Sequence, residues 1–182
     1  MHRELHIVGF QVGHETYGVP ITSLHEIIRV PEITAVPDAP DYMEGVINLR
    51  GKIVSVIDLR KRFGERKATP GKRNRILVVE HKGRLCGLIV DSASEVLKIP
   101  AEDVEPSTQV FQEGGLHCIT GLGKWKGRLI VLLDMSRLLQ QTGSPTPKVK
   151  EEIGGPGTPG AGSRAAAVGQ GPPAEARRQK NS

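Results

Sequence analysis

The residue types that carry most enzyme chemistry occur in this sequence, but their spacing forms no catalytic or metal-binding set. Its six histidines are His2, His6, His14, His25, His81 and His117. None of them lies in a His-Glu-x-x-His or His-x-His pattern, which would bring two imidazoles to one metal ion. The nearest approach is His25-Glu26, so we expect no metal site.

Motifs for phosphate binding and nucleophilic catalysis are also incomplete. Gly64 lies seven positions before Gly71, and Lys72 is followed by Arg73 where a P-loop needs a hydroxyl for magnesium. The Gly-x-Gly at residues 121–123 lacks a third glycine, and no Gly-x-Ser-x-Gly elbow occurs. We therefore expect no cofactor and no enzymatic activity. The enzyme alternative requires a pocket of converging titratable groups, which the sequence does not indicate.

The two cysteines, Cys86 and Cys118, belong to neither a Cys-x-x-Cys nor a zinc-finger spacing. Each lies in an apolar run, where cysteine commonly serves as a small buried hydrophobe. We expect buried thiols in a reduced, cytoplasmic protein. The N-terminus lacks the apolar segment of a signal peptide, and the longest apolar run, residues 129–133, is too short to span a bilayer, so no direct membrane insertion is expected.

The strongest binding signal is a hairpin in the segment from Gly45 to Leu59. Two apolar runs flank Arg50-Gly51, and Gly51 can supply the positive φ of a tight turn. Arg50 then projects from the tip, where its guanidinium can fork onto a carboxylate or backbone carbonyls of a partner. The alternative is an ordinary solvated turn arginine. The second copy of this pattern has Lys126 at the tip, which lacks the fork.

Three further residues are assigned structural roles. Asp58 and Asp134 occur at equivalent strand ends, where capping the next helical turn is favoured over catalysis. Trp125, the only tryptophan, replaces Leu49 of the first copy. We expect it to pack in a core or between subdomains, with a partner hot spot as the alternative.

Strands must position these residues, because short apolar or alternating runs rich in Val and Ile are separated by Gly, Pro and Asp. The expected strands are 5–12, 17–21, 45–49, 52–58, 75–81, 84–90, 94–99, 119–124 and 128–134. Thr22 or Ser23 is expected to cap a short helical turn through Leu24, Ile27 and Ile28. A second turn is expected from Asp134 through Met135, Leu138 and Leu139.

The sequence contains an internal repeat. Residues 17–21 match 86–90 and residues 26–31 match 95–100, both at an offset of 69. Residues 45–59 match 121–135 at an offset of 76, so the second copy carries an insertion of seven residues. Two copies of a Gly-punctuated strand pattern predict an all-β fold of two packed small barrels, since closure removes exposed sheet edges.

We therefore predict one folded domain over residues 1–141, with subdomains at about 5–70 and 71–141 and an exchange of elements between them left open. Residues 142–182 are predicted to be a disordered basic tail: residues 143–182 contain eight Gly, six Pro, six basic and three acidic residues. The tail is either a solvated extension or a weak electrostatic tether. Its charge of +3, out of a total of +5, leaves the folded part near neutral.

The alternative of a nucleic-acid-binding barrel is superficially favoured by the pI of 9.4. Only 3% of the residues are aromatic, however, which leaves few platforms for stacking bases. The near-neutral folded part also lacks the excess charge of a phosphate-binding face. We expect no nucleic-acid partner.

From Leu5 to Leu139, the sequence resembles the chemotaxis coupling (adaptor) protein family, CheW-like. The resemblance rests on Tyr17-Gly18-Val19 with Glu26-Ile27, on Gly45 through Gly51, on Ile57 through Arg60, and on Ile119 through Gly123. It implies two intertwined five-stranded SH3-like barrels with short helices and no catalytic activity. Residues 110–116 match no motif of the family that we can use, and the tail lies outside the resemblance.

The resemblance also implies the partners. Members link the cytoplasmic tips of methyl-accepting chemoreceptors to the regulatory domain of a chemotaxis histidine kinase, in arrays to which the cytoplasmic adaptor is recruited. An apolar groove between the barrels would receive the helical hairpin of the receptor. The matched positions expected to contact partners are Leu24, Glu26, Gly45, Asn48, Leu49, Arg50 and Gly51.

Overall fold

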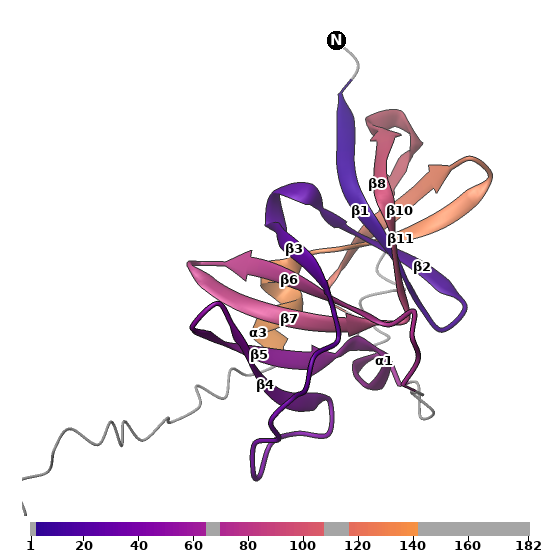
Figure 1. The fold of residues 1–182 in the computed structure, drawn as a ribbon. Helices are drawn as coiled ribbons and strands as arrows, with labels where there is room; N and C mark the ends of the chain where they lie inside the picture. Colours follow the sequence, from indigo (N-terminus) through magenta and orange to yellow (C-terminus); the bar gives the residue numbers. More distant parts are fainter. Residues whose placement is uncertain (1–2, 65–69, 108–116, 142–182) are drawn as a thin grey trace, which may run out of the picture. The chain divides into compact units, whose positions relative to one another are not determined.

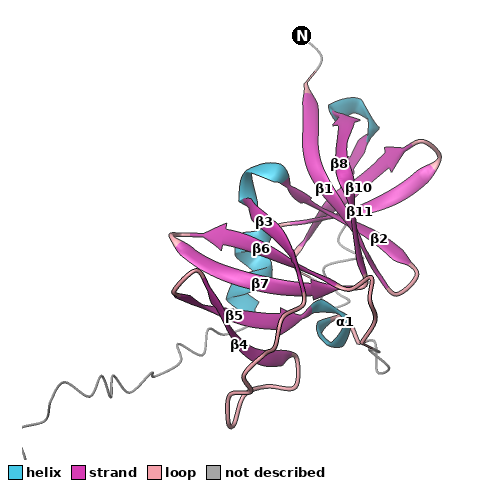
Figure 2. Cartoon of the chain, viewed as in Figure 1, coloured by secondary structure: helices cyan, strands magenta, loops and turns pink. Residues whose placement is uncertain are grey.

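The computed structural model describes residues 3–64, 70–107 and 117–141 (Figure 1). These residues form strands, a few short helices, and the loops and turns that connect them (Figure 2). The elements are β1 (Glu4–Val12), β2 (Glu15–Pro20), η1 (Ile21–Ser23), β3 (Leu24–Arg29), β4 (Met43–Leu49), β5 (Lys52–Asp58), α1 (Leu59–Arg62), β6 (Arg75–His81), β7 (Arg84–Val90), β8 (Ser92–Pro100), η2 (Ala101–Asp103), β9 (Val104–Pro106), β10 (Ile119–Trp125), β11 (Arg128–Leu133) and α3 (Met135–Gln141).

The strands form two sheets that exchange elements between the sequence repeats. Sheet A has six strands in the order β8-β1-β2-β11-β10-β9, and sheet B has five in the order β3-β6-β7-β5-β4. Sheet B joins β6 and β7 of the second repeat to three strands of the first, and sheet A joins β1 and β2 of the first repeat to four strands of the second. The repeats meet through the parallel pairs β2–β11 and β5–β7 and the antiparallel pairs β1–β8 and β3–β6. The sheets are therefore topologically equivalent, except that sheet A adds the short β9. The mostly β fold in two sheets confirms the predicted fold class.

Each sheet encloses its own apolar cluster, and a third cluster lies between the sheets. The sheet B cluster draws side chains from all five strands, including both edges: Ile28 of β3 and Ile47 of β4. The sheet A cluster includes Ile7, Ile99 and Ile130. Two edge strands can share one core only if the sheet curls, so the sheet B cluster shows that this sheet is strongly curved.

The inter-sheet cluster is the largest and combines side chains from both sheets. Its fully buried members include Phe10 and Val19 of sheet A and Leu77 and Leu88 of sheet B. Because apolar burial is the main favourable term in folding, this shared core gives each small sheet the partner that it needs. Both cysteines belong to it, Cys86 at 8% and Cys118 at 1% exposure, which confirms that they are buried.

One expected element is wrong. Leu24, Ile27 and Ile28 were assigned to a helical turn, but residues 24–29 form strand β3 and only residues 21–23 form a 3-10 turn. The burial of β3 alternates along the strand, and its backbone pairs with β6 from Leu24 to Arg29. The i, i+3, i+4 spacing that suggested a helix is outweighed by tertiary pairing with β6, whose central residues Ile76 to Val79 are buried.

The caps predicted at Asp58 and Asp134 and the packing role of Trp125 are confirmed. The cap predicted at Thr22 or Ser23 is wrong, because both residues lie inside η1, which follows Pro20 and has no side-chain cap. The Asp58 carboxylate accepts a hydrogen bond from the Arg60 N–H at the start of α1, and that of Asp134 accepts one from the Arg137 N–H at the start of α3. Trp125 is partly buried and packs against the sheet A cluster. The predicted disorder of residues 142–182 and the segment 110–116 lie outside the described residues. In the described parts, no helix is both long and apolar enough to cross a membrane.

Candidate partner-binding site

The β4–β5 hairpin turns in two residues, and both have positive φ. Leu49 pairs with Lys52, while Arg50 has φ 51° and Gly51 has φ 82°. A two-residue turn with two positive φ values is a type I′ turn, whose twist matches that of antiparallel strands. The Asn48 side-chain oxygen accepts a hydrogen bond from the Gly51 N–H at 2.8 Å and stabilises the turn. The predicted tight turn at Gly51 is confirmed.

Arg50 extends from this turn to Glu26 on the far edge strand. Its Nη2 donates to Glu26 Oε2 at 3.0 Å, although β3 and β4 are the two opposite edges of sheet B. The pair therefore lies where the two edges of the curved sheet approach each other. The Arg50 side chain is 74% exposed and the Glu26 side chain 21%, so most of the guanidinium faces solvent. Arg50 is thus oriented by Glu26 and still accessible.

Glu26 has a second oxygen with a different environment. Its Oε1 is buried and accepts no hydrogen bond from the described residues. His25 Nε2 lies 3.9 Å from this oxygen, and His25 Nδ1 lies 3.9 Å from Glu80 Oε2. His25 interrupts the pairing of β3 with β6, because the register shifts between Leu24 and Glu26. A β-bulge of this kind re-aims the side chain of the extra residue.

The remaining predicted contact residues do not share this surface. Leu49 points inward and packs against the sheet B cluster, and Leu24 packs against the inter-sheet cluster. Gly45 is buried at the other end of β4, roughly 16 Å from Arg50 at about 3.3 Å per strand residue. The structure therefore brings together Arg50 and Glu26, with Asn48 and Gly51 shaping the turn.

Gly45 is required by the backbone around it. It has φ +143°, and a Cβ there would lie 1.9 Å from the Thr34 carbonyl oxygen. Thr34 and Val46 exchange two backbone hydrogen bonds at this point, of 2.9 and 2.8 Å. In sheet A, a Cβ at the equivalent Gly121 would lie 2.6 Å from the Glu105 carbonyl oxygen. Both glycines therefore admit a neighbouring chain segment to the edge of a sheet.

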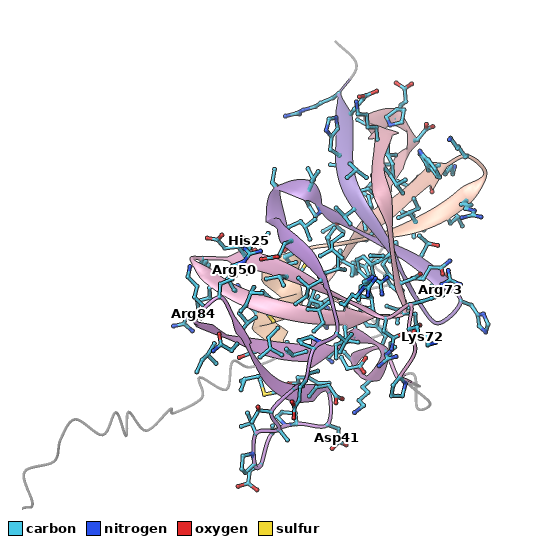
Figure 3. All side chains as sticks on the ribbon, in the orientation of Figure 1. His25, Asp41, Arg50, Lys72, Arg73 and Arg84 are labelled. Atoms are coloured by element: carbon cyan, nitrogen blue, oxygen red, sulfur yellow. The ribbon has the colours of Figure 1, made fainter. Side chains whose placement is uncertain are left out.

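Sequence reasoning missed the charged residues that surround the pair. In Figure 3, His25, Arg50 and Arg84 lie along the same side of the molecule. His25 was considered only as a metal ligand, and Glu80 and Arg84 were not singled out. The sign that would have identified them is a second two-residue turn, Lys82-Gly83, which Arg84 follows directly. Its φ values of 50° and 73° are similar to those of the Arg50 turn.

The second copy of the hairpin has a different chemistry. Lys126 also has positive φ, but its Nζ lies over the Trp125 ring, 4.5 Å from the centroid. Beside it, a hydrogen bond to Glu105 raises the pKa of Lys124. Neither lysine can fork onto a carboxylate as a guanidinium does. The two hairpin tips therefore share a backbone conformation but present different side-chain groups.

The described residues contain no cluster of three metal-ligating side chains. An exposed arginine held by a carboxylate on a rigid turn is suited to directed ionic recognition of another macromolecule. Together, the fold and this site define a binding module that is built from two β-sheets.

Comparison with known proteins identifies the family. The family model described as a CheW-like domain matches residues 6–143. The chain is 33% identical over 137 residues to the chemotaxis protein CheW of Helicobacter pylori, covering 75% of this chain and 82% of that one. It is 34% identical over 130 residues to the CheW of Klebsiella aerogenes, covering 71% and 78%. The crystal structure of the scaffolding protein TtCheW from Thermoanaerobacter tengcongensis superposes with a TM-score of 0.67 at 37% identity, covering 73% and 90%.

The chain therefore belongs to the CheW-like family, which confirms the resemblance in the sequence. It is a chemotaxis coupling adaptor that links receptors and kinase.

Proposed function

We propose that this adaptor binds the regulatory domain of a chemotaxis histidine kinase and the cytoplasmic tip of a methyl-accepting chemoreceptor, and that the Arg50–Glu26 pair forms part of the binding surface. The observation that carries the assignment of the surface is the 3.0 Å contact between a 74% exposed guanidinium and a carboxylate on the opposite edge of the sheet. An arginine restrained in this way has lost part of its conformational freedom before binding, so less is lost when a partner docks.

The kinase contact is assigned to the Arg50 surface, because its exposed hydrogen-bond donors are presented by a turn that the Asn48–Gly51 hydrogen bond stabilises. The guanidinium retains donors that a partner's carboxylate or backbone carbonyl can accept. The receptor contact is assigned to exposed apolar side chains on the edge strand of each sheet, Ile27 of β3 at 39% and Val96 of β8 at 50% exposure. These two residues are equivalent in the repeat and lie on strands that pair with members of the inter-sheet cluster.

The adaptor acts without catalysis in this proposal, and is recruited from the cytoplasm to membrane-associated receptor arrays. A protein without chemistry controls a kinase only by binding its active and inactive states with different free energies. Receptor conformation then biases the kinase because both are bound to the same rigid module. Modest affinity for each partner is sufficient, since an array supplies a high effective concentration.

The test separates the two partners. Wild type, Arg50→Glu and Lys126→Glu are each titrated against the isolated kinase regulatory domain and, separately, against receptor-bearing membranes. Lys126→Glu is the matched control, because it makes a charge reversal at the equivalent tip with the same backbone. Arg50→Glu places two carboxylates together, which weakens kinase binding by about tenfold or more if the coupling energy is 1.5 kcal/mol or larger.

Urea unfolding of the three proteins supplies the control for stability. Arg50 is mostly exposed, so the variant is expected to lose about 1 kcal/mol or less of unfolding free energy. Kinase binding that is unchanged in Arg50→Glu, or reduced equally in Lys126→Glu, contradicts the assignment of this surface.

A further inference from the structure

The chain crosses between the two sheets twice, and one of these crossovers consists of a single residue. Strand β7 of sheet B ends at Val90 and strand β8 of sheet A begins at Ser92, so Asp91 alone connects them. The other crossover, from β2 to β3, runs through the three residues of η1. A connection of one residue leaves only two soft backbone dihedrals to set the angle between the sheets at this point.

The Asp91 side chain is bound from sheet A. Its Oδ2 accepts a hydrogen bond of 2.7 Å from the backbone N–H of Gly13, in the turn between β1 and β2. The Asp91 backbone N–H donates to the Gln11 carbonyl at 2.9 Å, and the next residue, Ser92, donates from Oγ to Gln11 Oε1 at 3.1 Å. The crossover is thereby fixed to the β1–β2 hairpin.

The same carboxylate is bound from sheet B through Arg60. The Nη1 of Arg60 lies 3.4 Å from Asp91 Oδ1. Arg60 is itself fixed on α1, because its Nε and Nη2 donate to Asp58 at 2.9 and 2.7 Å. Its side chain is 6% exposed, and the hydrogen bond to Asp58 raises the pKa of Arg60, so the guanidinium stays charged. With the Asn74 amide turned so that its oxygen faces Arg60, Asn74 accepts from Nη1 at 2.9 Å.

The repeat supplies an internal comparison, because the equivalent positions lack the aspartate and the arginine. At offsets of 69 and 76, the counterparts of Asp91, Gly13 and Arg60 are Thr22, Lys82 and Ser136. There, Ser136 Oγ lies 3.5 Å from His81 Nδ1, at the limit of a hydrogen bond. Only one of the two equivalent junctions therefore carries an ionic connection among the described residues.

The inter-sheet core alone does not fix an angle. Apolar burial is non-directional, so it opposes separation of the sheets more strongly than a small rotation of one over the other. Hydrogen bonds are directional, and the Asp91 carboxylate accepts one of 2.7 Å from Gly13 of sheet A and a longer one of 3.4 Å from Arg60, which follows strand β5 of sheet B. A rotation would lengthen one of them.

We propose that Arg60 and Asp91 are positioning residues that fix the angle between the two sheets and so hold the two partner-binding surfaces in one register. Only the effect on signalling rests on the proposed function. An adaptor whose sheets rotate freely binds each partner but does not transmit the state of one partner to the other. The angle itself is a property of the free protein and is measured without partners.

The first experiment measures the angle directly. Spin labels are attached at Ile53→Cys on sheet B and Leu129→Cys on sheet A, which are 60% and 59% exposed, while the native cysteines stay buried. Asp91→Asn removes the charge that Arg60 contacts and leaves an oxygen for Gly13, and Arg60 keeps Asp58, so the fold is retained. We expect one narrow distance distribution in wild type and in the control Ser136→Ala, and a broadened one in Asp91→Asn.

A second measurement needs no variant. In wild type, exchange of the Gly13 amide with deuterium should be at least about tenfold slower than that of the equivalent Lys82 amide, because its bond to a carboxylate must open first. Equal rates, or an Asp91→Asn distribution as narrow as wild type, overturn the proposal.

Receptor, kinase and Asp91→Asn are then assayed together. The variant should bind kinase and receptor separately with wild-type affinity, but the receptor should no longer control the activity of the kinase. A rigid sheet angle together with normal control in Asp91→Asn also overturns the proposal. A wild-type protein that binds neither partner refutes the proposed function and leaves the measured angle intact.

Discussion

Gly45→Ala is expected to destabilise the fold more than its small size suggests. The new Cβ would lie 1.9 Å from the Thr34 oxygen, 2.7 Å from its carbonyl carbon and 3.0 Å from Ala35 Cα. All three are backbone atoms, which no rotamer change can move. Relief requires the loop before β4 to withdraw, and this breaks the two backbone hydrogen bonds between Thr34 and Val46.

The magnitude follows from two contributions. Holding alanine at φ +143° costs about 1–2 kcal/mol. Losing two backbone hydrogen bonds costs about 1 kcal/mol each. The expected loss of unfolding free energy is therefore about 3–4 kcal/mol. Gly51→Ala is the control, because Gly51 also has positive φ but a Cβ there meets no atom within 4 Å, so only the conformational cost of about 1–2 kcal/mol applies.

Urea denaturation followed by circular dichroism measures both variants. A Gly45→Ala loss no larger than that of Gly51→Ala refutes the reasoning, because the clash would then be absorbed without breaking the Thr34–Val46 pairing. Gly121→Ala is a second test through the repeat, since its Cβ would lie 2.6 Å from the Glu105 oxygen.

Three other perturbations have definite expected outcomes. Burial raises the pKa of the Cys86 thiol to about 12, so at pH 8 it is protonated and should react with iodoacetamide only on unfolding; rapid labelling of the native protein contradicts this. Asp134→Ala removes the cap of α3 and should lower the unfolding free energy by about 1 kcal/mol in urea, an unchanged midpoint being the contrary result. Arg60→Met leaves Asp58, 1% exposed, without its bidentate partner and should cost about 3–5 kcal/mol; a stability equal to that of wild type would show that the pair is not needed.

Most strands could be predicted because their signal is local. Alternating Val and Ile runs bounded by Gly located both strands of the Arg50 hairpin, and Asp58 and Asp134 marked the helical turns that follow. The helical turn predicted for Leu24–Arg29 was wrong because it rested on the spacing of apolar residues and not on the internal repeat. Residues 26–31 match residues 95–100, and residues 95–99 lie in a predicted strand. Equivalence within the chain was the stronger indicator.

The site was predictable in part for a related reason. The turn that presents Arg50 is encoded by adjacent residues, and its positive φ at Gly51 follows from residue type. The Arg50–Glu26 contact joins residues 24 apart across opposite sheet edges, and Arg60–Asp91 joins residues 31 apart at a crossover. Such pairs depend on how the sheets curve and exchange strands, and no local pattern specifies that. Gly45 meets a backbone requirement, and its contact with a partner stays a prediction, because motif position does not distinguish the two roles.

The central claim is that this chain places a kinase under receptor control. The most direct measurement combines receptor-bearing membranes and the chemotaxis histidine kinase of the same organism, with and without the chain, and reads kinase autophosphorylation in the sedimented fraction. We predict that active kinase sediments when the wild-type chain is present and not without it, that Arg50→Glu lowers the sedimented activity and that Lys126→Glu does not. Kinase that sediments with the same activity without the chain would contradict the account.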